Sequence, residues 1–324
     1  MTARRVTLSF LILAVAAVPM AAVDPALMKL VPPDATVVAG VNVEQARTTP
    51  FGQFVLKQMP LDDEGFGKMM EATGFDPRRD LREILVASKG GQPSKHIQGI
   101  VMATGSFDAP RIVAAAKVLG VTVTDYAGVE VLSSKESSNG GFAFLDRSLA
   151  IAGETEQVKA AIDRYKKGGA GPGATLAAKA AEWSGRTDLW FITTGSPADL
   201  AHRMPDSQAT GPMKAVSLDA IEQSSGGIKF GSVVKISVEA VARTDKDATA
   251  LGDVVRFVAG MVQLNRDKQG PDQMAALVDS MELKTDSRTL TLGLSVPQEQ
   301  LEKMIQSGHG PARKPAPRTK ATTI

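Results

Sequence analysis

The residues that most often carry catalysis or bind metal are scarce in this chain, which has 3 His and no Cys among 324 residues. His96, His202 and His309 lie far apart, and none has a second His, Cys or carboxylate at the spacing that metal ligands require. His96 could act as a lone general base, but a solvated loop residue is the simpler interpretation. We therefore expect no metal site, no cofactor and no recognisable catalytic residue.

Two short turns have residue types that could bind an anion. Thr104-Gly105-Ser106 and Thr194-Gly195-Ser196 each connect a predicted strand to a predicted helix, and backbone N–H groups at such a turn can hold a phosphate or carboxylate. Neither turn continues into Gly-Lys-Ser/Thr, and the chain has no dinucleotide-binding glycine pattern. The two sequences are more typical of turns and helix caps than of phosphate sites.

A hydrolase would need a nucleophile or a pair of carboxylates. The chain has no Gly-x-Ser-x-Gly nucleophile elbow. The acidic cluster Asp62-Asp63-Glu64 lies in a polar stretch, whereas a glycosidase needs two carboxylates that flank a cleft. The sequence does not place such a pair, so a hydrolase with an unrecognised site remains an alternative and not the favoured interpretation.

The segment 246–264 predicts a long helix whose apolar residues cover well over half of its circumference. Such a helix is either packed on two sides in a core or open along a groove that suits a partner helix or a lipid chain. Both interpretations stay open. The residues that would line a groove are Val254, Phe257, Val258 and Met261.

The first 22 residues have the pattern of a secretory signal. Arg4 and Arg5 precede a mostly apolar run, and Pro19-Met20-Ala21-Ala22 supplies the break and small residues that a signal peptidase favours. Ala14-Val15-Ala16 is an alternative cleavage site. The run is shorter than the roughly 20 residues of a membrane span, so cleavage is favoured over an uncleaved anchor. Without Cys there is neither lipidation nor a disulfide, which is typical of a periplasmic or secreted bacterial protein.

The net charge of +2 comes from the two ends of the chain. Arg4 and Arg5 carry two positive charges, the tail after residue 310 carries four, and neither segment has an acid, so the region between them has a net charge of −4. A negatively charged region of this kind lacks the positive surface that binds phosphate groups, which excludes nucleic acid as a partner. The basic tail suits contact with anionic envelope polymer or lipid, so membrane proximity is an expectation.

The predicted elements are organised around an α/β unit over residues 97–165, with a strand, a helix, an antiparallel meander and a closing helix. A similar order recurs over residues 232–305, which indicates an internal repeat. We therefore predict an α+β fold of two tandem repeats, each a mostly antiparallel sheet with helices packed on one face. The predicted divisions are a signal peptide 1–22, a first repeat 23–168, a linker 169–174, a second repeat 175–307 and a disordered basic, Pro-rich tail 308–324.

Several turn and strand sequences carry a resemblance to known proteins. After the export signal, a strand follows Val31-Pro32-Pro33-Asp34-Ala35, and Gly74-Phe75-Asp76-Pro77 and Asp80-Leu81 come next. With the two repeats and the Pro-rich tail, the chain resembles exported bacterial proteins whose families are named only as domains of unknown function. The resemblance implies an α/β fold and an envelope location, and it supplies no catalytic residue.

These observations favour an exported, non-catalytic envelope protein that binds another envelope protein or an apolar small molecule. The alternatives are the hydrolase considered above and a structural protein tethered to the membrane by an uncleaved signal. An apolar groove would favour binding, and a cleft with convergent polar side chains would favour catalysis. The sequence does not indicate the oligomeric state.

Overall fold

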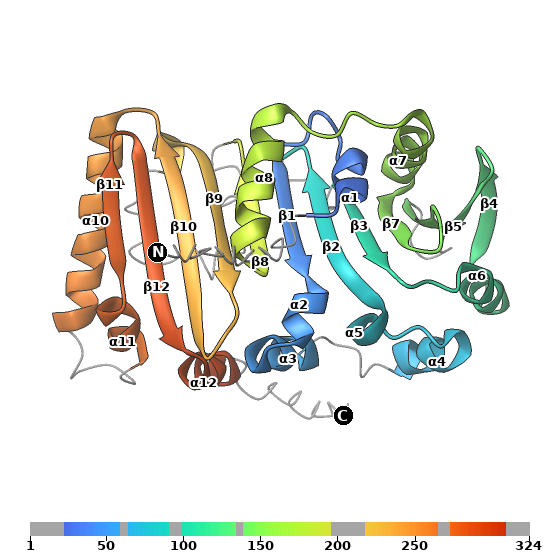
Figure 1. Ribbon diagram of the computed structural model, residues 1–324, viewed down its shortest axis with the longest axis horizontal. Helices are drawn as coiled ribbons and strands as arrows, with labels where there is room; N and C mark the ends of the chain where they lie inside the picture. The colour runs from blue at the N-terminus through green and yellow to red at the C-terminus, as the bar shows by residue number, and fades with distance from the viewer. Residues whose placement is uncertain are drawn as a thin grey trace, which may run out of the picture.

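The structure is a computed structural model that describes residues 23–58, 64–90, 99–133, 139–195, 218–264 and 273–308. One antiparallel sheet of 12 strands runs through the molecule in the order β11-β12-β10-β9-β8-β1-β2-β3-β7-β6-β5-β4 (Figure 1). The strands are β1 Val37–Asn42, β2 Leu81–Ser88, β3 Gly99–Gly105, β4 Thr122–Tyr126, β5 Val129–Ser133, β6 Gly140–Phe144, β7 Leu149–Glu154, β8 Leu189–Thr193, β9 Ile221–Lys229, β10 Val233–Ala242, β11 Glu282–Asp286 and β12 Thr289–Pro297.

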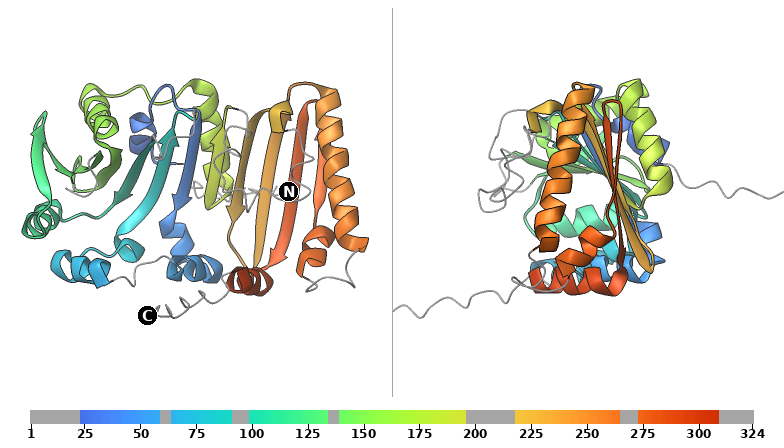
Figure 2. Two further views of the ribbon diagram at one scale, coloured as in Figure 1. Left: turned by 180° about the vertical axis from the view of Figure 1, so that it is seen from behind. Right: turned by 90° about the vertical axis from the view of Figure 1, so that its left-hand side faces the viewer.

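The helices cover both faces of this sheet and also the side where the strands end at the bottom of Figure 1. Figure 2 shows α8 and α10 on opposite sides of the strands. The α-helices are α1 Pro25–Leu30, α2 Val43–Arg47, α3 Pro50–Lys57, α4 Glu64–Thr73, α5 Pro77–Asp80, α6 Ala109–Val118, α7 Thr155–Lys167, α8 Ala174–Arg186, α10 Asp245–Leu264, α11 Gln273–Asp279 and α12 Gln298–Gly308. Among the described helices, none is long and apolar enough to cross a membrane.

The alternation of side chains along the strands separates two cores. Met102 of β3 and Trp190 of β8 point to a first face, where they pack with α1, α7 and α8 in the largest buried cluster. Ala103 points to a second face, because successive side chains in a strand project to opposite sides. Ala240 lies on this second face too, because it pairs through Ser224 with Thr193, three residues after Trp190. That face carries α6 at one end of the sheet and α10 at the other. The helices α2, α3 and α12 close the bottom of the molecule as drawn in Figure 1.

The centre of the sheet is the junction between the two predicted repeats. β1 pairs with β2 on one side and with β8 on the other, so strands from both halves of the chain share one ladder. Gly40 allows this pairing, because a Cβ atom there would lie 2.5 Å from the ring of Trp190. The predicted α+β class is confirmed. The expectation of a separate sheet in each repeat with helices on one face is wrong, because the strands form one sheet covered on both faces, and a tandem repeat is not shown.

Several predicted elements are confirmed locally. The helix predicted after the first strand of the unit 97–165 is α6, and the carboxylate of Asp108 caps it by accepting a hydrogen bond from the N–H of Arg111 at 3.3 Å. In the similar unit predicted over 232–305, β11 and β12 form an antiparallel hairpin whose turn residue Ser287 has a φ of 50°. A short helix is also predicted within residues 213–224; the structure has a 3-10 helix at Leu218–Ala220, β9 begins at Ile221, and residues 213–217 lie outside the described ranges.

Candidate binding site beneath α4 and α6

An apolar cavity of about 660 Å³ lies on the second face of the sheet, beneath α4 and α6. Its floor is formed by small side chains, with Ala103 of β3 directly paired with Ala150 of β7. Their strand neighbours Met102 and Ile151 point the other way and are fully buried in the first core. Because two methyl groups occupy positions where larger side chains would fill the layer, space remains between the strands and the helices.

Four phenylalanine rings form a continuous wall along the cavity. Phe75 lies 5.7 Å from Phe107, Phe107 lies 5.4 Å from Phe144, and Phe144 lies 4.8 Å from Phe142, measured between ring centroids. The last pair is edge-to-face at 84°, an arrangement that aromatic quadrupoles favour. These rings come from three separate parts of the chain, so their contacts hold the segments around Phe75, Phe107 and β6 together at the wall of the cavity.

The helix α6 covers the cavity and leaves one side open to solvent. Ile112, Ala115 and Ala116 face the cavity, and the buried part of this helix is limited to Val113. Leu119 lines the cavity and is still 64% exposed. This side chain therefore marks a mouth through which a ligand can enter.

The walls offer a ligand almost no hydrogen bonds. Among the described residues that line the cavity, Thr73 alone has a polar side chain. Its hydroxyl donates to the carbonyl oxygen of Met69 at 2.7 Å and accepts from the N–H of Phe75 at 3.2 Å. The site can therefore hold apolar groups, whereas a buried charged group would lose its hydration without compensation.

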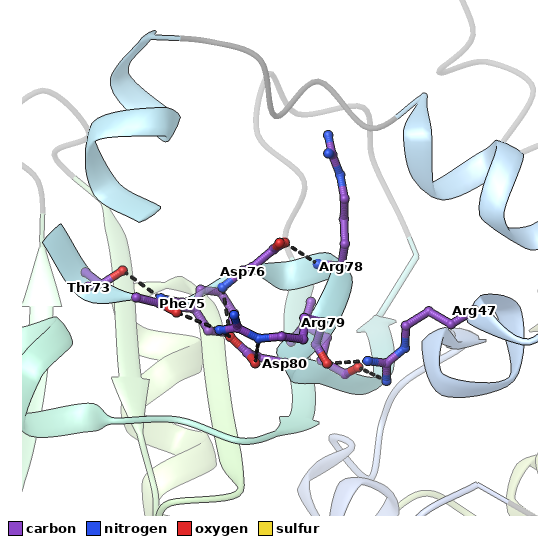
Figure 3. Close-up of polar contacts among 9 residues, drawn as sticks. Arg47, Thr73, Phe75, Asp76, Arg78, Arg79 and Asp80 are labelled. Carbon is purple, nitrogen blue, oxygen red and sulfur yellow. Dashed lines mark hydrogen bonds and ion pairs between the residues drawn. The ribbon is translucent and has the colours of Figure 1, made fainter. Parts of the chain in front are cut away.

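Polar contacts just outside the cavity fix the segment that carries Phe75 (Figure 3). The guanidinium of Arg79 donates to the carbonyl oxygen of Gly74 at 2.7 Å and to the carboxylate of Asp80 at 2.7 Å. Asp80 also accepts from the N–H of Asp76 at 2.8 Å. The hydrogen bond from Arg79 lowers the pKa of Asp80, so the carboxylate remains ionised and the turn keeps its partners.

Two further arginines connect this turn to neighbouring elements. Arg47 of α2 donates to the carbonyl oxygen of Leu81 at 2.9 Å and also to that of Arg79. Arg111 of α6 donates to the carbonyl oxygen of Ala72 in α4 at 3.2 Å. Because each arginine binds a backbone carbonyl, these contacts set the positions of α4, α5 and α6 and thereby the shape of the cavity.

The residues predicted for a groove lie elsewhere, on α10 at the other end of the sheet. Phe257 is 67% exposed and Met261 is 42% exposed, whereas Val254 and Val258 are half-buried. The structure brings the four residues together on one helix and does not place them at the cavity. That they form a ligand groove stays a prediction.

The two glycine turns are explained by packing within the chain. The N–H of Gly105 donates to the carbonyl oxygen of Ser148 at 2.9 Å, and the N–H of Ser106 donates to the backbone carbonyl oxygen of Asp80 at 2.9 Å. The N–H of Thr194 donates to the backbone carbonyl oxygen of Thr36 at 2.8 Å. These amides are occupied, which favours the turn interpretation over an anion site.

The remaining chemical candidates fall mostly outside the described residues. His96, His202 and His309 lie there, as do Asp62 and Asp63. Within the described ranges, no group of three or more His, Asp and Glu residues could hold a metal ion.

The cavity itself was not predicted from the sequence. One local signal was present, because Phe142-Ala143-Phe144 in an alternating strand places two rings on the same face. Nothing local connects those rings to Phe75 and Phe107, whose approach depends on the pairing of β2, β3, β7 and β6.

Among known proteins, the chain is similar in fold to solved structures. No protein-family model and no curated protein matches the chain. A crystal form of TP0453, an envelope-associated protein of Treponema pallidum, is similar over 88% of this chain and 98% of that chain, with a TM-score of 0.53 and 10% sequence identity. A second crystal form gives a TM-score of 0.50 and 11% identity over 89% of this chain and 98% of that one. At this identity the likeness shows the fold alone.

Proposed function

We propose that this chain is an exported, non-catalytic protein of the bacterial envelope that binds an apolar ligand in the cavity beneath α4 and α6. The observation that supports binding is the cavity itself, whose volume of about 660 Å³ falls within the roughly 300–1,000 Å³ of small-molecule sites. The signal sequence over residues 1–22 and the similarity of fold to TP0453 support the envelope location.

The ligand class follows from the walls. Each methylene group moved from water to an apolar wall gains about 0.8 kcal/mol, so a hydrocarbon chain binds in proportion to the length that enters. A charged headgroup has no partner among the lining residues that the structure describes, because the hydroxyl of Thr73 is bonded to Met69 and Phe75. The ligand is therefore an uncharged apolar molecule or a lipid whose acyl chain enters beside Leu119 while its headgroup stays in water.

A second function, the binding of another envelope protein, is supported by α10. Phe257, Met261 and Leu264 are 67%, 42% and 84% exposed, and their spacing places them on one side of the helix. Exposed apolar side chains grouped in this way are typical of an interaction surface. This function uses a different region from the cavity and is tested separately below.

The apolar dye 1-N-phenylnaphthylamine tests the first function, because it fluoresces strongly in an apolar site. We expect saturable binding to protein stripped of lipid, and displacement of the dye by a long-chain fatty acid. Ala115→Trp should fill the cavity and weaken dye binding at least tenfold. Ala114→Trp is the matched control, since Ala114 is the exposed neighbour on the same helix, and it should change the affinity less than twofold. Equal affinities in the two variants, or no dye binding by the wild type, would contradict the proposal.

A further inference from the structure

The point where the predicted signal peptide ends lies inside the fold. Val23 is only 7% exposed and belongs to the core cluster of the first face, together with Leu27 and Leu30 of α1. Its backbone N–H donates a hydrogen bond to the hydroxyl oxygen of Ser184 in α8 at 3.0 Å. The nitrogen that cleavage after Ala22 would convert into the mature amino terminus is therefore already held at a defined position.

A carboxylate lies next to this nitrogen. Glu83 of β2 accepts a hydrogen bond from the N–H of Asp24 at 2.9 Å. The side chain is half-buried, and burial raises its pKa to about 7, with the neighbouring charge of Asp24 acting in the same direction. Among the described residues, no Lys, Arg or His forms an ion pair with Glu83.

Standard backbone dimensions place the nitrogen atoms of adjacent residues at most about 3.7 Å apart. The nitrogen of Val23 therefore lies one residue spacing from a nitrogen that is hydrogen-bonded to the Glu83 carboxylate. When a signal peptidase adds water across the Ala22–Val23 peptide bond, the hydroxyl stays on the carbonyl carbon of Ala22. The nitrogen of Val23 leaves as an amine and takes up a proton.

We propose that removal of residues 1–22 creates the cationic partner of Glu83. The new α-ammonium group of Val23 pairs with this carboxylate and with the hydroxyl of Ser184. These two contacts, called the lock below, hold the segment that leads into α1 against β2 and α8. An ammonium group has three donors. One can stay on the hydroxyl oxygen of Ser184 while another reaches the Glu83 carboxylate.

This lock distinguishes the processed chain from its precursor. In the precursor, the nitrogen of Val23 is a neutral amide, so the Glu83 charge is partly buried without a cation. A carboxylate and an ammonium within about 4–6 Å favour each other's charged forms. Cleavage after Ala16 would leave Ala17 to Ala22 ahead of Val23 and would not place a charge at this site. The inference rests on the proposed export and is independent of the cavity ligand.

The test compares two chains made without residual tag residues, one that begins at Val23 and one that retains Met20-Ala21-Ala22. At pH 7.5 we expect the chain beginning at Val23 to melt at least about 3 °C higher, a shift expected when one interaction is added to a domain of this size. Glu83→Gln should remove most of this difference, because the amide carries no charge. Equal melting temperatures, or a difference that survives Glu83→Gln, would overturn the lock.

A second readout concerns the amino group itself. If the α-ammonium group is paired and shielded, acylation of Val23 by an amine-reactive ester should be at least tenfold slower than acylation of the extended terminus. Acylation at equal rates would contradict the pairing.

Mass spectrometry of the terminus formed in the bacterial envelope separates this inference from the proposed function. A terminus at Val23 supports both export and the lock. A terminus at Ala17 overturns the lock but keeps export. An uncleaved chain overturns the lock and the exported, processed state together, and a failure to bind the apolar dye affects only the ligand proposal.

Discussion

The two helices on the second face of the sheet, α6 and α10, meet the strands in different ways. Under α10, Ala248 and Leu251 are buried against Ala240 and Leu290, and the layer between helix and sheet is filled. Under α6 the buried part of the helix is limited to Val113, and a cavity separates the helix from the strands. One sheet thus has a close-packed end and a hollow end.

The difference lies in where the large side chains are placed. At the α10 end, small residues on the helix allow it to approach the sheet. At the α6 end, the rings of Phe107 and Phe144 lie 5.4 Å apart in the wall of the cavity, and its floor includes the small residues Ala103 and Ala150. The hollow end therefore lacks apolar contacts between helix and sheet that the close-packed end has.

The largest contrast is expected from removing side chains at the two ends. Leu251→Ala should lower the free energy of unfolding by about 2–5 kcal/mol, because a buried Leu loses its contacts and leaves a void. Ile112→Ala should cost about 1 kcal/mol or less, since Ile112 already borders empty space. Urea denaturation measures both, and equal losses would show that the cavity end is packed as tightly as the α10 end.

Adding volume should again destabilise the α10 end more than the cavity end. Ala248→Leu should destabilise the protein by about 1–3 kcal/mol, because Ala248 is fully buried and the strands lie directly beneath it. Ala115→Leu places the same extra atoms in the cavity and should leave stability unchanged or raise it, while dye affinity falls. The same denaturation experiment with dye titration checks this, and a loss of stability at Ala115 equal to that at Ala248 would contradict the comparison.

The hydrogen-bonded turn beside the cavity should have a smaller effect on stability than on binding. Asp80→Ala removes the acceptor of Asp76 N–H and of Arg79, which should cost about 1–2 kcal/mol. Because this turn positions Phe75, the dye affinity should fall several-fold more than in Asp253→Ala, the control at an exposed ion pair on α10. Unchanged affinity in Asp80→Ala would show that the turn does not shape the cavity.

The exposed residues of α10 should matter little for folding. Phe257→Ser is expected to change the free energy of unfolding by less than about 0.5 kcal/mol, and it should leave dye binding intact. Crosslinking in intact cells then tests the second function. The loss of one abundant crosslinked envelope protein in Phe257→Ser, but not in the exposed α10 control Arg256→Ser, would support a protein interface, whereas identical crosslinks in wild type and both variants would contradict it.

The smallest expected effect is that of pH on the hollow end. None of the described lining residues has an ionisable side chain, so affinity for the neutral dye should change less than twofold between pH 5 and 8.

A separate pH effect is expected in the stability of the chain that retains Met20-Ala21-Ala22. The pKa of its Glu83 is about 7 in the folded state and near 4.3 when unfolded. The stabilisation is thus fully present below about pH 4.3 and is lost as the pH rises through 7. A melting temperature that stays constant from pH 5 to 8 would contradict this assignment.

Local sequence patterns predicted those elements whose signals lie within a few residues. Asp108 followed by Pro110 and the apolar spacing to Leu119 predicted α6, and the Asp286-Ser287 turn predicted the last hairpin. β9 was missed because its centre, Gln223 to Gly227, is polar and glycine-containing, which is atypical of a buried strand.

The cavity and the buried carboxylate could not be predicted because both depend on distant contacts. Phe75 and Phe142 meet only after four strands have paired in register. Glu83 is next to Arg82 in the sequence, where a solvated side chain would be expected. It is half-buried in the fold, where it accepts a hydrogen bond from the distant Asp24 N–H. The groove on α10 was predicted from an excess of apolar residues in a single helix, a pattern that can be recognised in the local sequence.

The central position of β1 has a consequence for how the chain folds. β1 is one of the first strands to be made, yet one of its neighbours is β8, about 150 residues later in the chain. Pairings between such distant segments are slow to form, since a long loop must close before any contact forms. An unfolded chain can pass through a narrow export channel. For the exported protein that we propose, this connectivity delays closure of the sheet until β8 has been delivered, which keeps the chain unfolded during transport.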